Sequence, residues 1–568
     1  MGLIQRQTLM HRSWNTSQPG DQDLPNTGVT RNYTFDISRA VLAPDGYEKP
    51  MIVINGQYPG PMIEANLGDW IKVTVRNAIT EPEEGTAVHW HGFLQRETPW
   101  YDGVPSVQQC PIAPGSEFTY LFRADHIGTT FYHSHFSAQI SAGVSGPIII
   151  HGDTPPEEDI DLGPVLLSDW FHTQYEEIIE GVMSTNRTLM TPNSNNNLIN
   201  GKMNFDCSLA TDGTPCVSNA GVSKFRFQPG KAHRLRIING GSAGLQYFSI
   251  DEHEMTVISN DWVPIEPYNT TWLTLGVGQR HDVIVYGKTE SDADRAYWMR
   301  ANLSTVCALP LQPYALAGIY YNEEDFDKNT TPSSAAQDFD PSPLNCGNEP
   351  LTKTTPRTVV PAVTDPDTTI EIDITYAINA TGQQEWRMND IAFRGNMNHP
   401  IMGLLAEGND SYPHDPQWNV YNTGTNGTVR IIFNNERDAS ESFAHPMHLH
   451  GHDFQVLAQG SGTWDGTITN PSNPLRRDTH ILQPLGYLVI QYEANNPGVW
   501  PLHCHVAWHV SAGFYINLAE QPDDLQLIST IPEVVDQTCR DWEAWTDAHV
   551  VNQIDSGLKE KQRREDMS

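Results

Sequence analysis

A seven-residue stretch near the C-terminal end of the chain, HCHVAWH at 503–509, gathers three histidines around one cysteine. Imidazole nitrogens and thiolate sulfur are common metal ligands. Successive side chains of a strand point to opposite faces, so His503 and His505 share one face and Cys504 takes the other. A turn can return His509 to the side of the cysteine. The stretch therefore predicts a strand that faces two metal sites at once.

Three further clusters, HWHG, HSH and HPMHLHGH, repeat the H-x-H spacing in the first and last thirds of the chain. Each pair places two imidazoles on one face of a strand. Four such pairs could enclose one polynuclear metal site with eight nitrogens, shared between the two terminal domains. Its predicted ligands are His89, His91, His133, His135, His448, His450, His503 and His505.

Cys504 needs ligand partners on its own face, and His445 and His509 can supply two imidazoles. Two histidines and one cysteine in a trigonal array are the ligand set of a blue copper electron-transfer site. A structural zinc site is the competing interpretation, but it takes four ligands and favours paired cysteines. We expect the remaining histidines, including His126, His253, His399 and His480, to support the fold or lie at the surface, and His452 to lie behind the metal ligands as a supporting residue.

The segments that must position these residues read mainly as short strands, interrupted by Gly, Pro and Asn. Examples are WIKVTVRNAI, HRLRIING, HDVIVYG and YLVIQYEA. Convincing amphipathic helices are few, the best candidates lying near 169–182 and 522–537, and polar stretches at 151–164 and 322–368 look like domain connections. The pattern predicts an all-β protein with three domains built as antiparallel sandwiches or barrels.

The four motifs resemble those of multicopper oxidases, and more narrowly those of the laccases of filamentous ascomycete fungi. HWHG, YHSHFSAQ, HPMHLHGHDF and HCHVAWHVSAG stand in the order of the family's copper motifs, and the resemblance runs from about residue 30 to 558. It implies three cupredoxin-like Greek-key β-sandwich domains at 30–155, 160–325 and 365–545. A C-terminal tail follows at 546–568.

The resemblance also implies four copper ions. The type 1 copper is expected at His445, Cys504 and His509, and the type 2 copper at His89 and His448. The two type 3 coppers complete a trinuclear cluster with the type 2 ion, and their expected ligands are His91, His133, His135, His450, His503 and His505.

Two further positions matter for the expected chemistry. Phe514, ten residues after the cysteine, occupies the axial position of the type 1 site and cannot bind the metal, which should raise the copper's potential. Asp102, in WYDGVP, matches an acidic residue near the trinuclear site that can relay protons for O₂ reduction. Its alternative role is that of a turn residue before Gly103. We expect Asp102, Cys504 and His509 to be catalytic.

The implied function is a copper oxidase that removes single electrons from phenolic substrates and reduces O₂ to water. One departure concerns the substrate: Asn197 stands beside the LING motif, where ascomycete laccases carry an acidic residue, and Asp206 comes later. A phenol-coupling oxidase of pigment or secondary metabolism is therefore an alternative, as is an Fe(II) or Mn(II) oxidase. A copper-binding or electron-transfer protein is a third, but it would not need eight trinuclear ligands.

Charge and sequons bear on partners and location. With 69 acidic and 34 basic residues, the net charge of −35 disfavours nucleic acid or an anionic membrane surface as a partner. No apolar run is long enough for a membrane span. We expect the partners to be O₂ and a small phenolic substrate, and we expect the protein to be a monomer. The first residues lack the apolar core of a signal peptide, yet nine N-x-S/T sequons favour secretion.

The chain has seven cysteines, an odd number that leaves Cys504 without a disulfide partner. Cys207 and Cys216 are close enough in sequence to close a local loop. The family resemblance implies the pairs Cys110–Cys539 and Cys307–Cys346. It also implies proteolytic processing after Leu558, in the sequence DSGL, and inward packing of Asp555–Leu558 as a plug toward the trinuclear site.

Overall fold

Strands dominate the computed structural model, which describes residues 24–152, 158–289, 295–408, 416–425, 427–435, 443–528, 530–549 and 554–555. These strands form six sheets, two in each third of the described chain. Each pair of sheets encloses buried apolar side chains, as a β-sandwich does. The predicted all-β class with three cupredoxin-like sandwiches is confirmed.

The first sandwich combines a sheet of order β2-β1-β4-β6 with one of order β3-β8-β7-β5. Strands β3, β4 and β6 alternate buried with more exposed positions, whereas β5 and β7 are buried throughout. In β4, for example, Ile71, Val73 and Val75 point into the core. The strands are β1 (Thr30–Leu42), β2 (Lys49–Ile54), β3 (Ile63–Asn66), β4 (Trp70–Asn77), β5 (Val88–Trp90), β6 (Glu117–Arg123), β7 (Gly128–Ser134) and β8 (Ser145–His151).

The second sandwich combines sheets of order β10-β9-β12-β17-β14-β15 and β11-β19-β18-β13-β16. Its strands are β9 (Ile160–Trp170), β10 (Asn196–Ile199), β11 (Ser223–Arg226), β12 (Ala232–Asn239), β13 (Gln246–Ile250), β14 (Met255–Asn260), β15 (Val263–Thr270), β16 (Trp272–Leu275), β17 (Arg280–Tyr286), β18 (Tyr297–Leu303) and β19 (Tyr314–Tyr320). The predicted connection at 322–368 contains no strand before β20, which begins at Thr368.

The third sandwich combines sheets of order β21-β20-β23-β28-β25-β26 and β22-β30-β29-β24-β27. Its strands are β20 (Thr368–Ile378), β21 (Gln384–Met388), β22 (Val420–Asn422), β23 (Thr428–Asn434), β24 (His445–Leu449), β25 (Phe454–Ser461), β26 (Leu475–Arg477), β27 (Thr479–Leu482), β28 (Gly486–Glu493), β29 (Gly498–Cys504) and β30 (Tyr515–Glu520).

Helices are few and mostly short. Both predicted helical regions are confirmed: one is α2 (Tyr175–Val182), and the other divides into α6 (Pro522–Ile528) and α7 (Glu533–Ala548). Three unpredicted helices are α3 (Glu323–Lys328), α4 (Ile401–Ala406) and α5 (Ala507–Ser511). Each has at most six residues, too short for an amphipathic pattern to reveal. None of the described helices is both long and apolar enough to cross a membrane.

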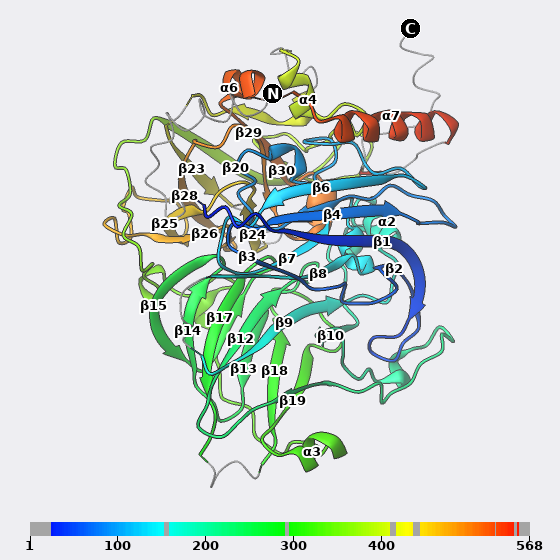
Figure 1. Ribbon diagram of the computed structural model, residues 1–568, viewed down its shortest axis with the longest axis vertical. Coiled ribbons are helices and arrows are strands. Elements are labelled where there is room, and N and C mark those ends of the chain that lie inside the picture. Colours follow the sequence, from blue (N-terminus) through cyan, green and yellow to red (C-terminus); the bar gives the residue numbers. More distant parts are fainter. Residues whose placement is uncertain are drawn as a thin grey trace.

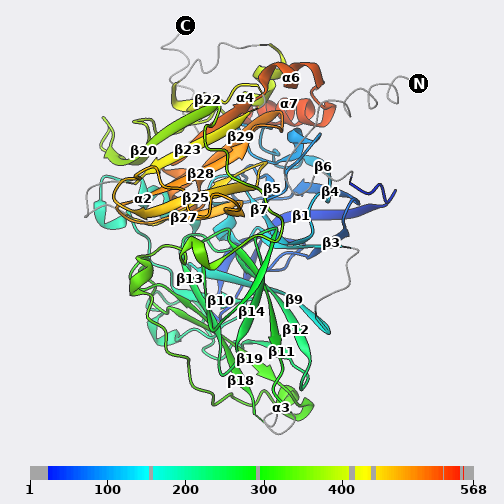
Figure 2. The same ribbon diagram turned by 90° about the vertical axis from the view of Figure 1, so that its left-hand side faces the viewer.

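The two terminal sandwiches lie side by side at one end of the molecule, and the middle sandwich forms the other end (Figure 1; Figure 2). One continuous cluster of buried apolar side chains joins the first and third sandwiches, whereas the middle sandwich has a core of its own. The histidine motifs of the first and third sandwiches can therefore meet at the interface between them.

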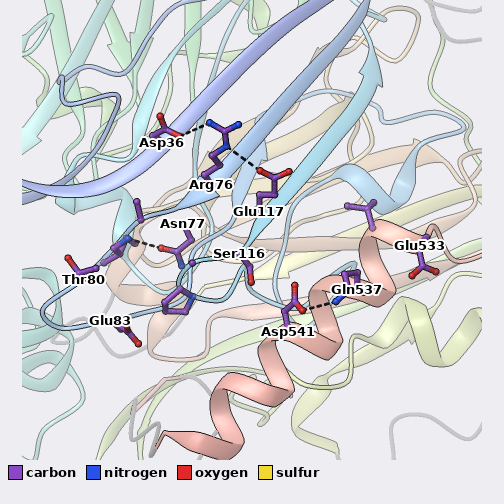
Figure 3. A pocket seen from close by; sticks show the side chains of 15 residues that line it. Asp36, Arg76, Asn77, Thr80, Glu83, Ser116, Glu117, Glu533, Gln537 and Asp541 are labelled. Carbon is purple, nitrogen blue, oxygen red and sulfur yellow. Dashed lines mark hydrogen bonds and ion pairs between the residues drawn. The ribbon is translucent and has the colours of Figure 1, made fainter.

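Three disulfides form, as predicted: Cys110–Cys539, Cys207–Cys216 and Cys307–Cys346. Cys504 is free and buried. The first disulfide ties α7 to the first sandwich, where a groove of about 1080 Å³ separates the helix from β1, β4 and β6 (Figure 3). None of the predicted metal ligands lines this groove.

Candidate metal centre

Each H-x-H pair lies at the end of a strand, with its second histidine just past the strand's last residue. In the first sandwich β5 pairs with β7, and His89 lies opposite His133. In the third, β24 pairs with β29, and His448 lies opposite His503. Strand pairing thus joins the two H-x-H pairs within each terminal sandwich. The second histidine of each pair lies beyond the strand's last residue and can therefore turn toward the other histidines.

The interface between the sandwiches then joins the two halves. The ring centroids of His89 and His450 lie 4.0 Å apart, and those of His91 and His448 lie 3.9 Å apart. The structure brings all eight predicted histidines into one buried cluster, with ring contacts between them. Within it, three sets of three histidines have ligand nitrogens less than 4.8 Å from one another.

The nitrogens that face the centre lack protein partners suited to hydrogen bonding. Nε2 of His89, His133 and His448 is buried without any hydrogen-bond partner. Nε2 of His503 meets only other imidazole nitrogens, at 3.0 Å from His450 and 3.4 Å from His135. Buried polar atoms are nearly always satisfied, so these orphaned nitrogens fit a metal cluster.

The opposite ring nitrogens are held by oxygen atoms. Nδ1 of His133 and of His503 bonds the backbone oxygen of the following residue, at 3.0 and 2.8 Å. Nδ1 of His448 bonds the backbone oxygen of Asp478 at 2.9 Å. Such bonds fix the tautomer and the ring orientation, leaving the other nitrogen free as a metal ligand.

A second, smaller cluster lies on the other side of β29. Sγ of Cys504 is 3.7 Å from Nδ1 of His445 and 3.5 Å from Nδ1 of His509, and these two nitrogens are 3.2 Å apart. The side chain of Cys504 therefore points to the opposite face of the strand from His503 and His505, as predicted. Helix α5 is the turn that returns His509 to the thiol, because one helical turn begins at Ala507.

Aromatic rings enclose this cluster. Phe514 is fully buried with its ring centroid 4.6 Å from that of His445. Trp386 of β21 lies 4.8 Å from His445 and 4.9 Å from His509, centroid to centroid. His509 alone among the three predicted ligands is partly exposed. The cluster is buried except at one imidazole.

Electrostatics favour neutral imidazoles in both clusters. Burial, reinforced by neighbouring imidazoles, lowers the pKa of His91, His133, His135, His448, His450 and His505 well below the usual histidine value. Burial lowers the pKa of His509 to about 3 and raises that of the Cys504 thiol well above its usual value. A thiolate here therefore requires a compensating cation, which again fits a metal.

Asp102 touches the larger cluster from the end of a 3-10 turn. Its backbone oxygen accepts a hydrogen bond of 2.8 Å from Nδ1 of His89, and its Oδ2 one of 2.8 Å from Nδ1 of His450. Gly103 follows with a φ of +92°, where a Cβ would lie 1.9 Å from the oxygen of Val88. Asp102 thus lies in a turn and also contacts two histidines. The structure is compatible both with its role as a turn residue and with a role beside the metal cluster.

Sequence reasoning missed Asp478 and Thr479, at the junction of β26 and β27. Oδ1 of Asp478 is 3.3 Å from Nε2 of His91, and Oγ1 of Thr479 is 3.1 Å from Nδ1 of His448. Neither residue belongs to a repeated spacing, so no local pattern in the sequence singles them out.

Three other predicted positions form hydrogen bonds with residues outside both clusters. Nε2 of His452 bonds Oε2 of Glu520 at 2.8 Å. Asn197 is buried in the middle sandwich, where its amide bonds Gln246 and the backbone oxygen of Ala301. Asp206 is exposed, and its carboxylate accepts a hydrogen bond from the backbone of Ser208.

The C-terminal segment approaches the larger cluster. A small cavity of about 50 Å³ is lined by His135, Ser137, Tyr515 and Asp555, among others. Oδ2 of Asp555 accepts a hydrogen bond of 2.6 Å from Ser137, and burial raises the pKa of this carboxyl. Leu558 and the predicted cleavage after it lie outside the described residues, so processing stays a prediction.

Comparison with known proteins agrees with this geometry. Multicopper oxidase families match residues 36–155, 161–324 and 378–524. The chain is 38% identical to oxidoreductase OpS5 of Beauveria bassiana and 35% identical to laccase-2 of Botryotinia fuckeliana; each match covers 94% of this chain and 89% of the relative.

The fold is also similar to that of a solved multicopper oxidase structure. The laccase from Botrytis aclada superposes with a TM-score of 0.85 at 33% identity, covering 95% of this chain and 96% of the other. The family models, the relatives and the solved structure match this chain over nearly its whole length. The two clusters of candidate metal ligands lie where the family's motifs predict copper. The chain therefore belongs to the multicopper oxidase family.

Proposed function

We propose that this multicopper oxidase is an enzyme of laccase type, which takes single electrons from a phenolic substrate and reduces O₂ to water. The observation that carries the proposal is the tripeptide His503-Cys504-His505, whose thiol faces one ligand cluster while its imidazoles face the other. A site for one-electron oxidation and a site for O₂ are thereby joined through a single strand.

The proposed copper arrangement assigns one ion to the cysteine cluster and three to the histidine cluster. The type 1 copper is held by His445, Cys504 and His509. His89 and His448, the first histidines of their motifs, hold the type 2 copper, and both present an unpartnered Nε2. The type 3 pair is held by His91, His133, His135, His450, His503 and His505. Copper, when bound, supplies the reversible one-electron chemistry and the activation of O₂.

His509 is the point of contact with a reducing substrate. It is the partly exposed member of the cysteine cluster, whereas the rings of Trp386 and Phe514 exclude water from the rest. A planar phenol can lie against the exposed edge of this imidazole and be held by apolar and aromatic contacts. Asn197 bonds Gln246 and Ala301, and Asp206 bonds Ser208, so we propose neither residue as an anchor for the phenol.

Asp102 takes part in the reduction of O₂ at the histidine cluster. Its Oδ1 is buried 3.2 Å from Nδ1 of His89, so this oxygen can hold a proton beside the histidine cluster. Reduction of O₂ to water consumes protons, and a carboxyl group within reach can deliver them. The position of Asp555 and Ser137 beside His135 offers a polar route from the cavity to the same cluster.

We also propose that the enzyme is a secreted monomer, with sandwich bounds at 30–155, 160–325 and 365–545. Three disulfides suit an oxidising compartment. Several sequon asparagines are exposed, among them Asn32, Asn186, Asn269 and Asn329, and so are open to glycosylation.

Oxygen uptake with a substrate panel tests the function. We expect the copper-loaded protein to consume one O₂ for every four molecules of a simple phenol oxidised, without forming hydrogen peroxide. Polycyclic phenols and Fe(II) are the comparison substrates. Turnover of Fe(II) alone would contradict the laccase assignment in favour of a metallo-oxidase. Absence of O₂ uptake with every substrate would instead indicate an electron-transfer protein.

A further inference from the structure

A turn of the middle sandwich, which supplies no predicted ligand, lies directly against the histidine cluster. Gly278, between β16 and β17, has a φ of +89°. A Cβ built there would lie 3.0 Å from Cε1 of His91 and 3.1 Å from Cδ2 of His505. The backbone of the middle sandwich therefore packs on one histidine from each terminal sandwich, and only glycine allows this approach.

Arg280, the first residue of β17, reaches across the same interface. Its guanidinium is fully buried, and both terminal nitrogens donate to Asp478, with Nη1 at 2.6 Å from Oδ1 and Nη2 at 2.6 Å from Oδ2. Oδ1 of Asp478 is the atom that lies 3.3 Å from Nε2 of His91. A bidentate pair of this kind fixes the plane of the carboxylate, and so fixes the oxygen presented to the imidazole.

Asp261, in the turn after β14, holds the neighbouring backbone. Its carboxylate accepts hydrogen bonds from Nε of Arg477 at 3.0 Å and from the backbone nitrogens of Asp478 and Thr479 at 3.2 and 3.4 Å. It also accepts from the backbone nitrogen of Arg280 at 2.9 Å. Two arginines and two aspartates thus form a closed, buried network in which each charge is paired.

We propose that Arg280 and Gly278 are positioning residues of the trinuclear copper site, through which the middle sandwich orients the imidazoles of His91 and His448. The inference rests on the proposed function, because it presumes copper at that cluster. Arg280 acts through Asp478 and Thr479, and Gly278 acts by close packing on His91. The alternative, a network that merely joins the sandwiches, would affect folding stability and leave the two copper sites equally occupied.

Two variants with matched controls separate these roles. Arg280→Lys keeps the charge but loses the bidentate fork. Its control is Arg300→Lys, because Arg300 also makes a bidentate pair, through Nε and Nη2, with Asp251 at 2.7 and 2.8 Å, and its hydrogen-bond partners among the described residues belong to the middle sandwich and the following connection. Gly278→Ala adds a methyl group against His91, and its control is Gly230→Ala, at a φ of +67° with nothing within 4 Å.

The measurement is copper retention at each site under a chelator titration of the holoenzyme. The type 1 and type 2 signals are followed by electron paramagnetic resonance, together with the thermal unfolding of the copper-free protein. We expect Arg280→Lys and Gly278→Ala to weaken copper binding at the trinuclear site by about ten- to a hundredfold, while the type 1 site retains its affinity. Both controls should leave the ratio of the two signals at the wild-type value.

The inference is overturned if Arg280→Lys and Gly278→Ala keep wild-type affinity at the trinuclear site, or if both sites weaken in parallel with stability. If Arg280→Lys alone fails to fold, Gly278→Ala decides by the same criterion. A wild-type protein that binds copper without a type 1 signal would overturn the proposed function itself, whereas a normal wild type with unaffected variants overturns only the positioning role.

Discussion

Asp102 and His450 are 348 positions apart in the chain, yet Oδ2 of Asp102 accepts a hydrogen bond of 2.8 Å from Nδ1 of His450. The same aspartate bonds His89 through its backbone oxygen. One residue of the first sandwich therefore orients one histidine of each terminal sandwich. Its second carboxylate oxygen, Oδ1, lies 3.2 Å from Nδ1 of His89 beside the cluster, where it can carry a proton.

Asp102→Asn should separate the two halves of the reaction. The amide retains the shape of the carboxyl but cannot carry the same proton. Reduction of the type 1 copper by phenol should therefore remain near the wild-type rate, while reoxidation by O₂ slows by about a hundredfold or more. Stopped-flow absorbance measures both steps, with the exposed Asp206→Asn as control. Reoxidation at the wild-type rate would reduce Asp102 to a turn residue.

Cys504→Ser should abolish the blue colour and phenol oxidation. A serine hydroxyl is a hard and weakly acidic ligand that cannot replace a thiolate at a type 1 site. Because Cys504 is the one free cysteine, the three disulfides are unaffected. Visible absorbance and copper content measure the change. An intense visible band in the variant would show that the type 1 copper is not bound by this thiol.

Phe514→Met should lower the potential of the type 1 copper. The buried ring lies beside His445, so a thioether in its place can approach the metal as a weak axial donor, which stabilises Cu(II). Phe514→Leu is the matched control, because it removes the ring without adding a donor, and its potential should stay near that of the wild type. Redox titration distinguishes them. An unchanged or higher potential in the methionine variant would mean that residue 514 is not axial.

His126→Gln should lower the free energy of unfolding in a pH-dependent way, because His126 lies at the interface of the three sandwiches. His126 bonds Asp125 and, across the interface, Asp453, both at 2.9 Å, and stacks on Trp262 of the middle sandwich. Burial by itself lowers the pKa of His126, but the charges of Asp453 and Asp125 raise it to about 10. The pKa is thus higher in the folded than in the unfolded chain, so the ion pairs stabilise fully below about pH 6.5.

That stabilisation is lost as the pH rises toward about 10. The variant should therefore be less stable than the wild type by roughly 2–4 kcal/mol near pH 6, and the difference should shrink in alkali. Denaturant unfolding at several pH values measures it. The control is His151→Gln, which removes an exposed pair with Glu64 and should cost little at any pH. A difference independent of pH would contradict the charged state of His126.

The sequence by itself determined which residues are the candidate metal ligands, because the period of two along a strand places H-x-H imidazoles on one face and the intervening Cys504 on the other. It also determined most strands, and the family resemblance supplied the long-range disulfides. What it could not indicate was the one-turn helix α5, whose five residues are too few to show a period.

Only the tertiary structure decided which groups support the ligands. Asp478, Arg280 and Gly278 belong to no repeated spacing, and their proposed role arises from the packing of three separate sandwiches around one cluster. Local periodicity fixes the face on which a side chain lies. Hydrogen-bond partners 198 or 387 positions away in the sequence depend instead on how whole sheets pack, and that information is spread over their buried surfaces.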